Sequence, residues 1–278
     1  MSDPIRVIVI GAHPDEPDVY AGGTAALFAE MGHKVKFLSL TNGDAGHSRM
    51  KGKELSERRA REAQEAAKHL GIEEYEILDN HDGALMSTLE LRQEVIRRIR
   101  NWKADVVIAF HPDGCTHTDN RYAGRIVADA SAFVAKVPNI VPDTPSLDKA
   151  PLFLLMPDYS MRNRYRADIV VDIGPALEKK LLACDAHATQ FYEFAPHEKE
   201  MNDTIPQDWE GKREFLLRGW AAFMDVSDEM KQALRQGYGS SRAEAIRYAE
   251  PFEYASYNVG PLTDERRLAL FPMIRSNS

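Results

Sequence analysis

The sequence predicts an α/β protein with a Rossmann-like, mostly parallel sheet, helices on both faces and a C-terminal helical and irregular appendage. Two observations support this class. Short aliphatic runs alternate with longer segments of helical periodicity over roughly the first 185 residues. After about residue 196 this alternation gives way to one long helical pattern and an aromatic tail. Strands that alternate with helices are joined by right-handed crossovers and run parallel.

The predicted strands are short apolar runs bounded by polar or glycine residues. In chain order they cover residues 5–10, 35–40, 75–78, 106–110, 152–156 and 169–173. Such continuous apolar runs are typical of parallel strands that are buried on both faces.

The predicted helices fill the segments between these strands. The helix over residues 53–70 places Leu55, Ala63 and Leu70 on one face and ends before Gly71, a residue type that favours helix C-termini. A capping box at residues 87–90 begins the next helix, which continues to Trp102. The remaining helices are predicted at residues 22–31, 121–135, 175–187 and 209–235.

Composition limits the classes of function. The chain has 278 residues, of which 44% are hydrophobic and 28% charged, as in ordinary globular proteins. Its net charge of −8 argues against a nucleic-acid partner. No apolar run approaches the roughly 20 residues of a membrane helix, and the N-terminus lacks the features of a signal peptide. Two cysteines form no disulfide framework, so we expect a cytoplasmic protein.

The loop after the first predicted strand contains His13, Asp15, Glu16 and Asp18. A dinucleotide site would have glycines here, because backbone N–H groups must approach the pyrophosphate. Carboxylates repel phosphate instead. Acidic side chains in a loop often serve only solubility, but this density of ionisable groups at the end of a strand favours a metal site over that interpretation.

The loop after the fourth predicted strand is similarly rich in imidazole and carboxylate groups, with His111, Asp113, His117 and Asp119. The carboxyl ends of parallel strands meet at one edge of the sheet, so both loops can reach a single ion. Histidine and carboxylate ligands suit zinc. Cys115 is an alternative nucleophile beside His117, although a small buried side chain is the commoner role of a free cysteine.

The sequence has neither the G-x-S-x-G motif of serine hydrolases nor a P-loop. It resembles instead the LmbE / PIG-L family of zinc-dependent N-deacetylases. The resemblance covers roughly residues 5–195 and is carried in order by residues 7–15, 41–46, Arg59 with Glu62, Leu70-Gly71, His81-Asp82-Gly83, and His117 with Asp119. It implies a Rossmann-like sheet and removal of an acetyl group from an N-acetylated amino sugar or related amide, which would be the small-molecule partner.

The resemblance also implies roles for individual residues. It places Asp15 as the general base, and His117 with Asp119 as the pair that assists the oxyanion or the leaving amine. The ligands of Zn²⁺ or another divalent metal would be His13, Glu16 and Asn120. We expect Arg59 and Asp82 to bind substrate, against the alternatives of an Arg59–Glu62 surface pair and a turn at Asp82-Gly83.

Two of these ligand positions depart from the family pattern. Glu16 replaces an aspartate, and Asn120 replaces a histidine whose imidazole is a better zinc donor than an amide oxygen. Three outcomes follow: a weaker or harder-metal site, recruitment of His111 or His117, or a site without metal. We therefore expect a metal-dependent N-deacetylase, and the alternative is a catalytically silent ligand-binding or scaffold protein on the same fold.

We expect residues 1–195 to form the deacetylase-like domain and residues 196–278 to pack on it as a helix and tail. The aromatic segment over residues 248–257 is a candidate subunit contact, which would make the protein a homo-oligomer.

Overall fold

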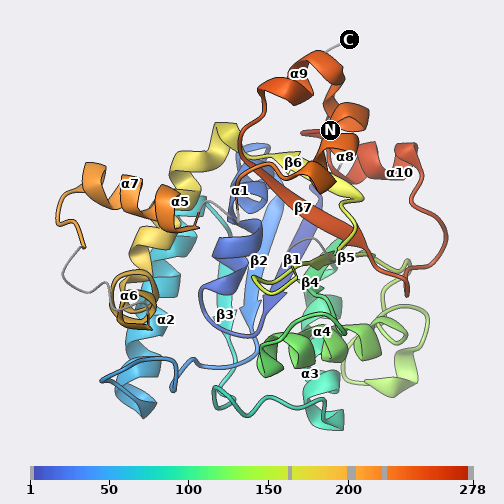
Figure 1. Cartoon of the computed structure of the whole chain (residues 1–278). Coiled ribbons are helices and arrows are strands. Elements are labelled where there is room, and N and C mark those ends of the chain that lie inside the picture. Colours follow the sequence, from blue (N-terminus) through green and yellow to red (C-terminus); the bar gives the residue numbers. More distant parts are fainter. Residues whose placement is uncertain (1–2, 162–164, 199–204, 221–223, 275–278) are drawn as a thin grey trace.

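The computed structural model describes residues 3–161, 165–198, 205–220 and 224–274. Its centre is one seven-stranded sheet with the strand order β3-β2-β1-β4-β5-β7-β6 (Figure 1). The strands are β1 (Arg6–Gly11), β2 (Lys34–Ser39), β3 (Glu74–Ile77), β4 (Val106–Phe110), β5 (Leu152–Met156), β6 (Ile169–Asp172) and β7 (Ala249–Tyr254). The α/β class with a mostly parallel sheet is confirmed.

The chain reverses its direction of travel across the sheet between β1 and β4. From β1 it moves outward through β2 to β3, and it then returns to place β4 on the other side of β1. Val9 at the centre of β1 pairs with Phe37 of β2 and Ile108 of β4, both in parallel register. Ligands of such sheets bind beyond the carboxyl ends of the strands at this switch point. The topology therefore predicts a ligand site among the loops after β1, β2, β3 and β4.

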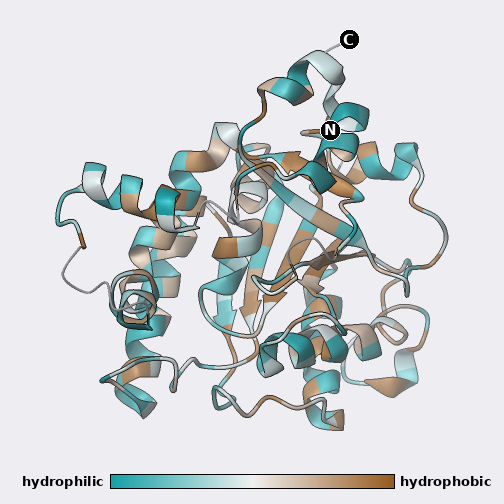
Figure 2. Cartoon of the chain, in the orientation of Figure 1, coloured by the Kyte–Doolittle hydropathy of each residue, from teal (hydrophilic) through white to brown (hydrophobic). Residues whose placement is uncertain are grey.

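Helices cover both faces of the sheet. On one face α1, α2 and α5 contact one another, and on the other α3 packs against α4. The apolar strands lie between these layers, and hydrophilic residues lie on the outer helix surfaces (Figure 2). The helices are α1 (Glu16–Glu30), α2 (Gly52–Leu70), α3 (Leu89–Trp102), α4 (Thr118–Ser131), α5 (Leu177–Ala186), α6 (Ala195–Glu198), α7 (Trp209–Trp220), α8 (Asp228–Tyr238), α9 (Ser240–Ala245) and α10 (Asp264–Leu270), with the short η1 (Pro138–Ile140), η2 (Gly174–Ala176) and the π-helix η3 (Thr189–Phe194). None of the helices in these described ranges is long and apolar enough to cross a membrane.

Three elements differ from the sequence-based expectation. Helix α1 begins at Glu16, six residues earlier than expected, with Pro17 in its first turn, where a missing N–H costs nothing. The single helix expected over residues 209–235 is two helices, α7 and α8. The tail expected to be irregular contains β7, which lies between β5 and β6 and is antiparallel to both. The domain boundary at residue 195 stays a prediction.

The charged pair Glu250–Lys180 explains how an acidic residue is buried in β7. Its side-chain atoms are at most 1% exposed, and Lys180 Nζ lies 2.6 Å from Glu250 Oε1. The same carboxylate accepts hydrogen bonds from the backbone N–H groups of Gly23 (2.9 Å) and Thr24 (2.7 Å) in α1. The pair thus joins β7 to α1 and α5.

We predict that Glu250→Ala lowers the free energy of unfolding by about 3–5 kcal/mol, because it leaves the ammonium of Lys180 buried without its countercharge. Urea unfolding of the two proteins measures this difference. The matched control is Glu178→Ala, which breaks an exposed ion pair with Arg213 and should cost about 0–1 kcal/mol. Equal losses in the two variants would contradict a structural role for the buried pair.

Candidate functional site

The site is built from loops at the carboxyl ends of three strands. His13 follows β1 and Glu16 begins α1. Asp82 lies in the loop after β3, and Asp119 lies in the first turn of α4, which follows β4. The first loop is held in place because Ala12 O accepts hydrogen bonds from Thr41 N and Thr41 Oγ1, both at 2.8 Å. All four acidic or imidazole side chains belong to residues that are at most 8% exposed.

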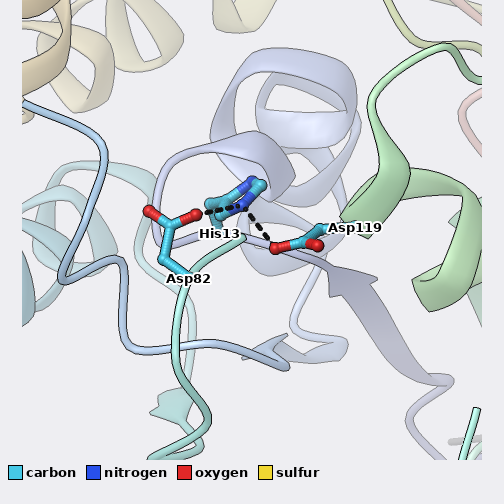
Figure 3. A group of neighbouring side chains, drawn as sticks. All are labelled: His13, Asp82 and Asp119. Carbon is cyan, nitrogen blue, oxygen red and sulfur yellow. Dashed lines mark ion pairs between the residues drawn. The ribbon is translucent and has the colours of Figure 1, made fainter. Parts of the chain in front are cut away.

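The imidazole of His13 faces a carboxylate at each of its nitrogens. Nε2 lies 3.0 Å from Asp82 Oδ1 and 3.4 Å from Asp119 Oδ2 (Figure 3). Nδ1 lies 3.2 Å from Glu16 Oε1. A neutral imidazole carries one N–H, so its other nitrogen would present a lone pair to a carboxylate. This arrangement requires a second proton or a cation.

The electrostatics of these side chains agree with this geometry. Burial disfavours the charged imidazole, but the negative charge of Glu16 and the hydrogen bonds to Asp119 and Asp82 outweigh it and raise the pKa of His13 well above its usual value. Burial likewise opposes the ionised form of Asp82, yet His13 and Arg59 hold its pKa well below its usual range. The pKa of Asp119 is lowered by His13 and by backbone N–H groups in spite of burial.

Backbone hydrogen bonds fix two of the carboxylates. Glu16 Oε2 accepts from the N–H groups of Ala12 and His13, each at 2.8 Å. Asp119 accepts from Gly83 N at 2.7 Å and Leu85 N at 3.3 Å. These oxygens are therefore oriented by the fold itself, as the supporting shell of a metal or catalytic site must be.

Two buried polar atoms beside this cluster have no hydrogen-bond partner within the described residues. They are Asn120 Oδ1 and His117 Nδ1. The His117 ring stands edge-on to that of His13 with 4.9 Å between centroids. Asn120 is 2% exposed, and a buried group without a partner is costly in the absence of a ligand. The donor set and these unpartnered atoms fit a divalent cation.

One group of possible metal ligands is well defined in the described chain. Ligand atoms of His13, Asp82 and Asp119 all lie within 4.8 Å of one another. This set shares His13 with the ligands expected from the sequence but replaces Glu16 and Asn120 with two aspartates. The roles of Glu16 and Asn120 stay predictions.

Close packing brings α4 to this edge of the sheet. A Cβ added to Gly124 would lie 2.4 Å from the carbonyl oxygen of Phe110, so only glycine lets the helix approach the end of β4 this closely. The first turn of the same helix carries Asp119 and Asn120.

Arg59 points into the site rather than pairing with Glu62. Its guanidinium lies 2.7 Å from Asp15 Oδ1 and 3.7 Å from Asp82 Oδ2, and the residue is 2% exposed. Asp82 contacts His13 and also lines the cavity, and the substrate-binding roles of Arg59 and Asp82 stay predictions. His117 Nδ1 has no hydrogen-bond partner in the described chain, and the pairing of His117 with Asp119 stays a prediction. The catalytic roles of Asp15 and His117 stay predictions.

A cavity of about 630 Å³ opens above these residues. His13, Asp15, Glu16, Asp82 and His117 are part of its lining. Sequence reasoning did not find Tyr20, Tyr159, Gln190 and Trp220, which line the cavity from four separate segments. The π-helix η3, which carries Gln190, could have indicated this part of the cavity, because π-helical turns are frequent at functional sites. The sequence pattern does not reveal such a turn.

Comparison with known proteins confirms the family resemblance. Residues 8–131 match the model of the family described as PIG-L, GlcNAc-PI de-N-acetylase. A diacetylchitobiose deacetylase of Thermococcus kodakarensis is 29% identical over 203 residues, 69% of this chain and 72% of that protein.

Two further relatives differ in the reaction that they are named for. A probable N-acetyl-alpha-D-glucosaminyl L-malate deacetylase 2 of Bacillus cereus is 26% identical over 192 residues, 66% of this chain and 83% of that protein. A 4-oxalmesaconate hydratase of Pseudomonas putida is 26% identical over 192 residues, 66% of this chain and 73% of that protein.

The fold has close structural counterparts. An N,N'-diacetylchitobiose deacetylase from Pyrococcus horikoshii superimposes with a TM-score of 0.68 at 24% identity, covering 95% of this chain and 89% of that one. At this identity the similarity establishes the fold alone.

We predict that the metal-free protein loses stability as the pH rises above about 6.5, the usual pKa of an unfolded histidine. The folded state binds the His13 proton more tightly than the unfolded chain does, because the pKa of His13 is raised. Its stabilising contribution is therefore complete below pH 6.5 and is lost as the pH rises through the raised value.

Urea unfolding at several pH values between about 6 and 9 tests this prediction. The buried His187, whose pKa is also raised by Asp18 against the effect of burial, titrates in the same direction. The difference between the wild type and His13→Gln isolates the contribution of His13, since His187 is present in both. Parallel pH profiles for the two proteins would contradict the prediction.

Proposed function

We propose that this chain, whose residues 8–131 match the GlcNAc-PI de-N-acetylase family, is a metal-dependent hydrolase that removes the acetyl group from an N-acetylated amino sugar or related amide. The observation that carries the proposal is the His13 imidazole held between carboxylates at the floor of a cavity. The reaction is proposed from the relatives of Thermococcus kodakarensis and Bacillus cereus, both of which are named as deacetylases.

We assign the cation to the Nδ1 side of His13. On that side Glu16 Oε1 lies 3.2 Å from Nδ1. Asn120 offers a buried amide oxygen that has no partner in the described chain. A metal-bound histidine ordinarily donates its other N–H to a carboxylate, and Asp82 and Asp119 are placed to accept from Nε2. His13, Glu16 and Asn120 would thus hold the ion, with the two aspartates behind the imidazole.

A divalent cation, when bound, supplies a Lewis acid that polarises the amide carbonyl and lowers the pKa of water. The other functions belong to side chains of this chain. Asp15 lines the cavity, and Arg59 fixes one of its carboxylate oxygens at 2.7 Å, so Asp15 is oriented to accept a proton from the attacking water.

His117 lines the same cavity from the loop after β4, the strand beside β1. Its imidazole can donate a hydrogen bond to the oxyanion that develops on the acetyl carbonyl, or a proton to the departing amine. The amide C–N bond then breaks, acetate is released and the amine leaves with the proton that His117 provides.

A ligand-binding protein without catalysis is the second candidate. The observation that favours it is Asn120, because an amide oxygen is a weaker ligand for zinc than the imidazole that the family pattern has there. Metal content and turnover distinguish the two candidates.

We predict that Glu16→Gln abolishes zinc binding and that Asn120→His strengthens it, because the first removes a charged ligand and the second adds an imidazole. Asp82→Asn should weaken binding by only about 10–100-fold, the usual effect of changing a residue that supports a ligand. Calorimetric titration with zinc measures all three, with Asp79→Asn as control, since Asp79 is exposed and bonded to Asn42. A greater loss of zinc affinity in Asp82→Asn than in Glu16→Gln would show that the ion binds on the Nε2 side of His13.

We predict that Asp15→Asn lowers kcat by about 10²–10⁴-fold, because it removes the proton acceptor. Zinc content should stay near that of the wild type, since the proposed ligands are intact. The measurement pairs metal per chain with release of amine from an N-acetylated sugar. Asp113→Asn is the control, because Asp113 is exposed in the neighbouring loop and pairs with Arg125. Undiminished turnover in Asp15→Asn would show that another group is the base.

A further inference from the structure

A chain of hydrogen bonds runs from helix α2 through the π-helix η3 to the imidazole of His13. It begins at Glu62 on α2, whose carboxylate accepts from Thr189 N at 3.2 Å and from Thr189 Oγ1 at 2.5 Å. Thr189 is the first residue of η3 and is completely buried. Hydrogen bonds to a buried carboxylate are among the stronger ones in proteins, so α2 fixes the position at which η3 begins.

Gln190 is the next member of the chain. It is 8% exposed and lines the cavity. Its amide nitrogen Nε2 lies 3.0 Å from Gly46 O and 3.4 Å from Thr189 Oγ1. An amide nitrogen carries two N–H groups, and these two acceptors use both. A backbone carbonyl can only accept, so the contact with Gly46 also determines which way round the amide group lies.

Gly46 connects Gln190 to the carboxylate of Asp82. Its carbonyl accepts from Gln190, and its N–H donates to Asp82 Oδ2 at 3.0 Å. The other oxygen of Asp82, Oδ1, lies 3.0 Å from His13 Nε2 (Figure 3). A Cβ added to Gly46 would lie 3.2 Å from both Asp82 Oδ2 and Arg59 Nη1, so glycine allows the backbone to approach these side chains closely.

The loop that contains Gly46 depends on such side-chain contacts for its position. It spans residues 40–51, and none of these described residues belongs to a helix or strand. Besides Gln190, η3 supplies Glu193, which lies 3.0 Å from His47 Nε2. The loop in turn holds the backbone of Asp82, because Asp44 Oδ1 accepts from Asp82 N at 3.0 Å. The place of this loop therefore determines how Asp82 is presented to the imidazole.

We propose that Gln190 is a positioning residue for the metal site. It holds Gly46 where the glycine N–H orients Asp82, and Asp82 orients the imidazole of His13. The inference rests on the metal site of the proposed function, and it makes the geometry of that site depend on a segment 144 residues from Gly46 in the sequence. Residues that orient a metal-bound histidine commonly affect metal affinity without contacting the ion.

Zinc affinity of Gln190→Met tests the proposal, because methionine keeps the length of the side chain and removes both N–H donors. We expect the affinity to fall by roughly 3–10-fold, the factor that corresponds to the net contribution of one hydrogen bond. Gln64→Met is the matched control, since Gln64 Nε2 also donates to a backbone carbonyl, that of Tyr75 at 2.7 Å, and does not line the cavity. Unchanged affinity in Gln190→Met, or an equal loss in the control, would overturn the proposal.

A second variant separates the hydrogen bond from packing. Gln190→Glu keeps the size of the side chain but places a carboxylate against the Gly46 carbonyl, so it should lose at least as much zinc affinity as Gln190→Met. Urea unfolding confirms that each variant is folded before titration. Wild-type affinity in a folded Gln190→Glu would refute a role for the amide donor.

Kinetics distinguish positioning from direct contact with substrate. With an N-acetylated sugar and saturating zinc, displacement of the imidazole should lower kcat of Gln190→Met, because catalysis is sensitive to small shifts of the groups that hold the reacting atoms. A raised KM together with unchanged kcat and zinc affinity would instead assign Gln190 to substrate contact and overturn the proposal.

A wild type that binds no zinc would refute the proposed function but still test the hydrogen-bond chain. NMR would then compare the ring signals of His13 in the proteins without added metal. We expect these signals to move in Gln190→Met and to stay in place in Gln64→Met, because only the first change reaches His13 through Gly46 and Asp82. Ring signals at wild-type positions in Gln190→Met would overturn the inference.

Discussion

The imidazole of His13 is the constraint on which the site depends. Both of its nitrogens face carboxylate oxygens, so a neutral ring would always place one lone pair against negative charge. A proton on the second nitrogen relieves this repulsion. In the proposed function a divalent cation would relieve it instead, so proton and metal would compete for the same imidazole.

The fold holds these groups together against their mutual repulsion. Backbone N–H groups bind Glu16 and Asp119, and a glycine lets α4 approach the end of β4. The buried pair Lys180–Glu250 ties α1 to a strand more than two hundred residues later in the chain. Stability gained in the core and at such tertiary contacts offsets the unfavourable concentration of acids at the sheet edge, as is common for functional sites.

The sequence predicted most of the sheet because parallel strands are continuous apolar runs, and it predicted the location of the site because ionisable residues follow two of them. Strand β7 was not predicted because Glu250 and Pro251 interrupt the apolar pattern. The buried ion pair with Lys180 neutralises the Glu250 carboxylate, and the sequence gives no local sign of this tertiary contact. The contact of Asp82 with His13 was missed for a similar reason, since a turn residue gives no local sign of its partner. Tyr159 and Trp220 come from segments whose convergence is set by topology.

The most direct test of the account is a crystal structure of the zinc-loaded protein with the metal located by anomalous scattering. We predict that zinc lies within about 2.0–2.2 Å of His13 Nδ1 and a Glu16 oxygen, while His13 Nε2 stays hydrogen-bonded to Asp82 or Asp119. A zinc ion bound to Nε2 between the two aspartates, with Glu16 still bonded to His13 Nδ1 and to backbone N–H groups, would contradict it.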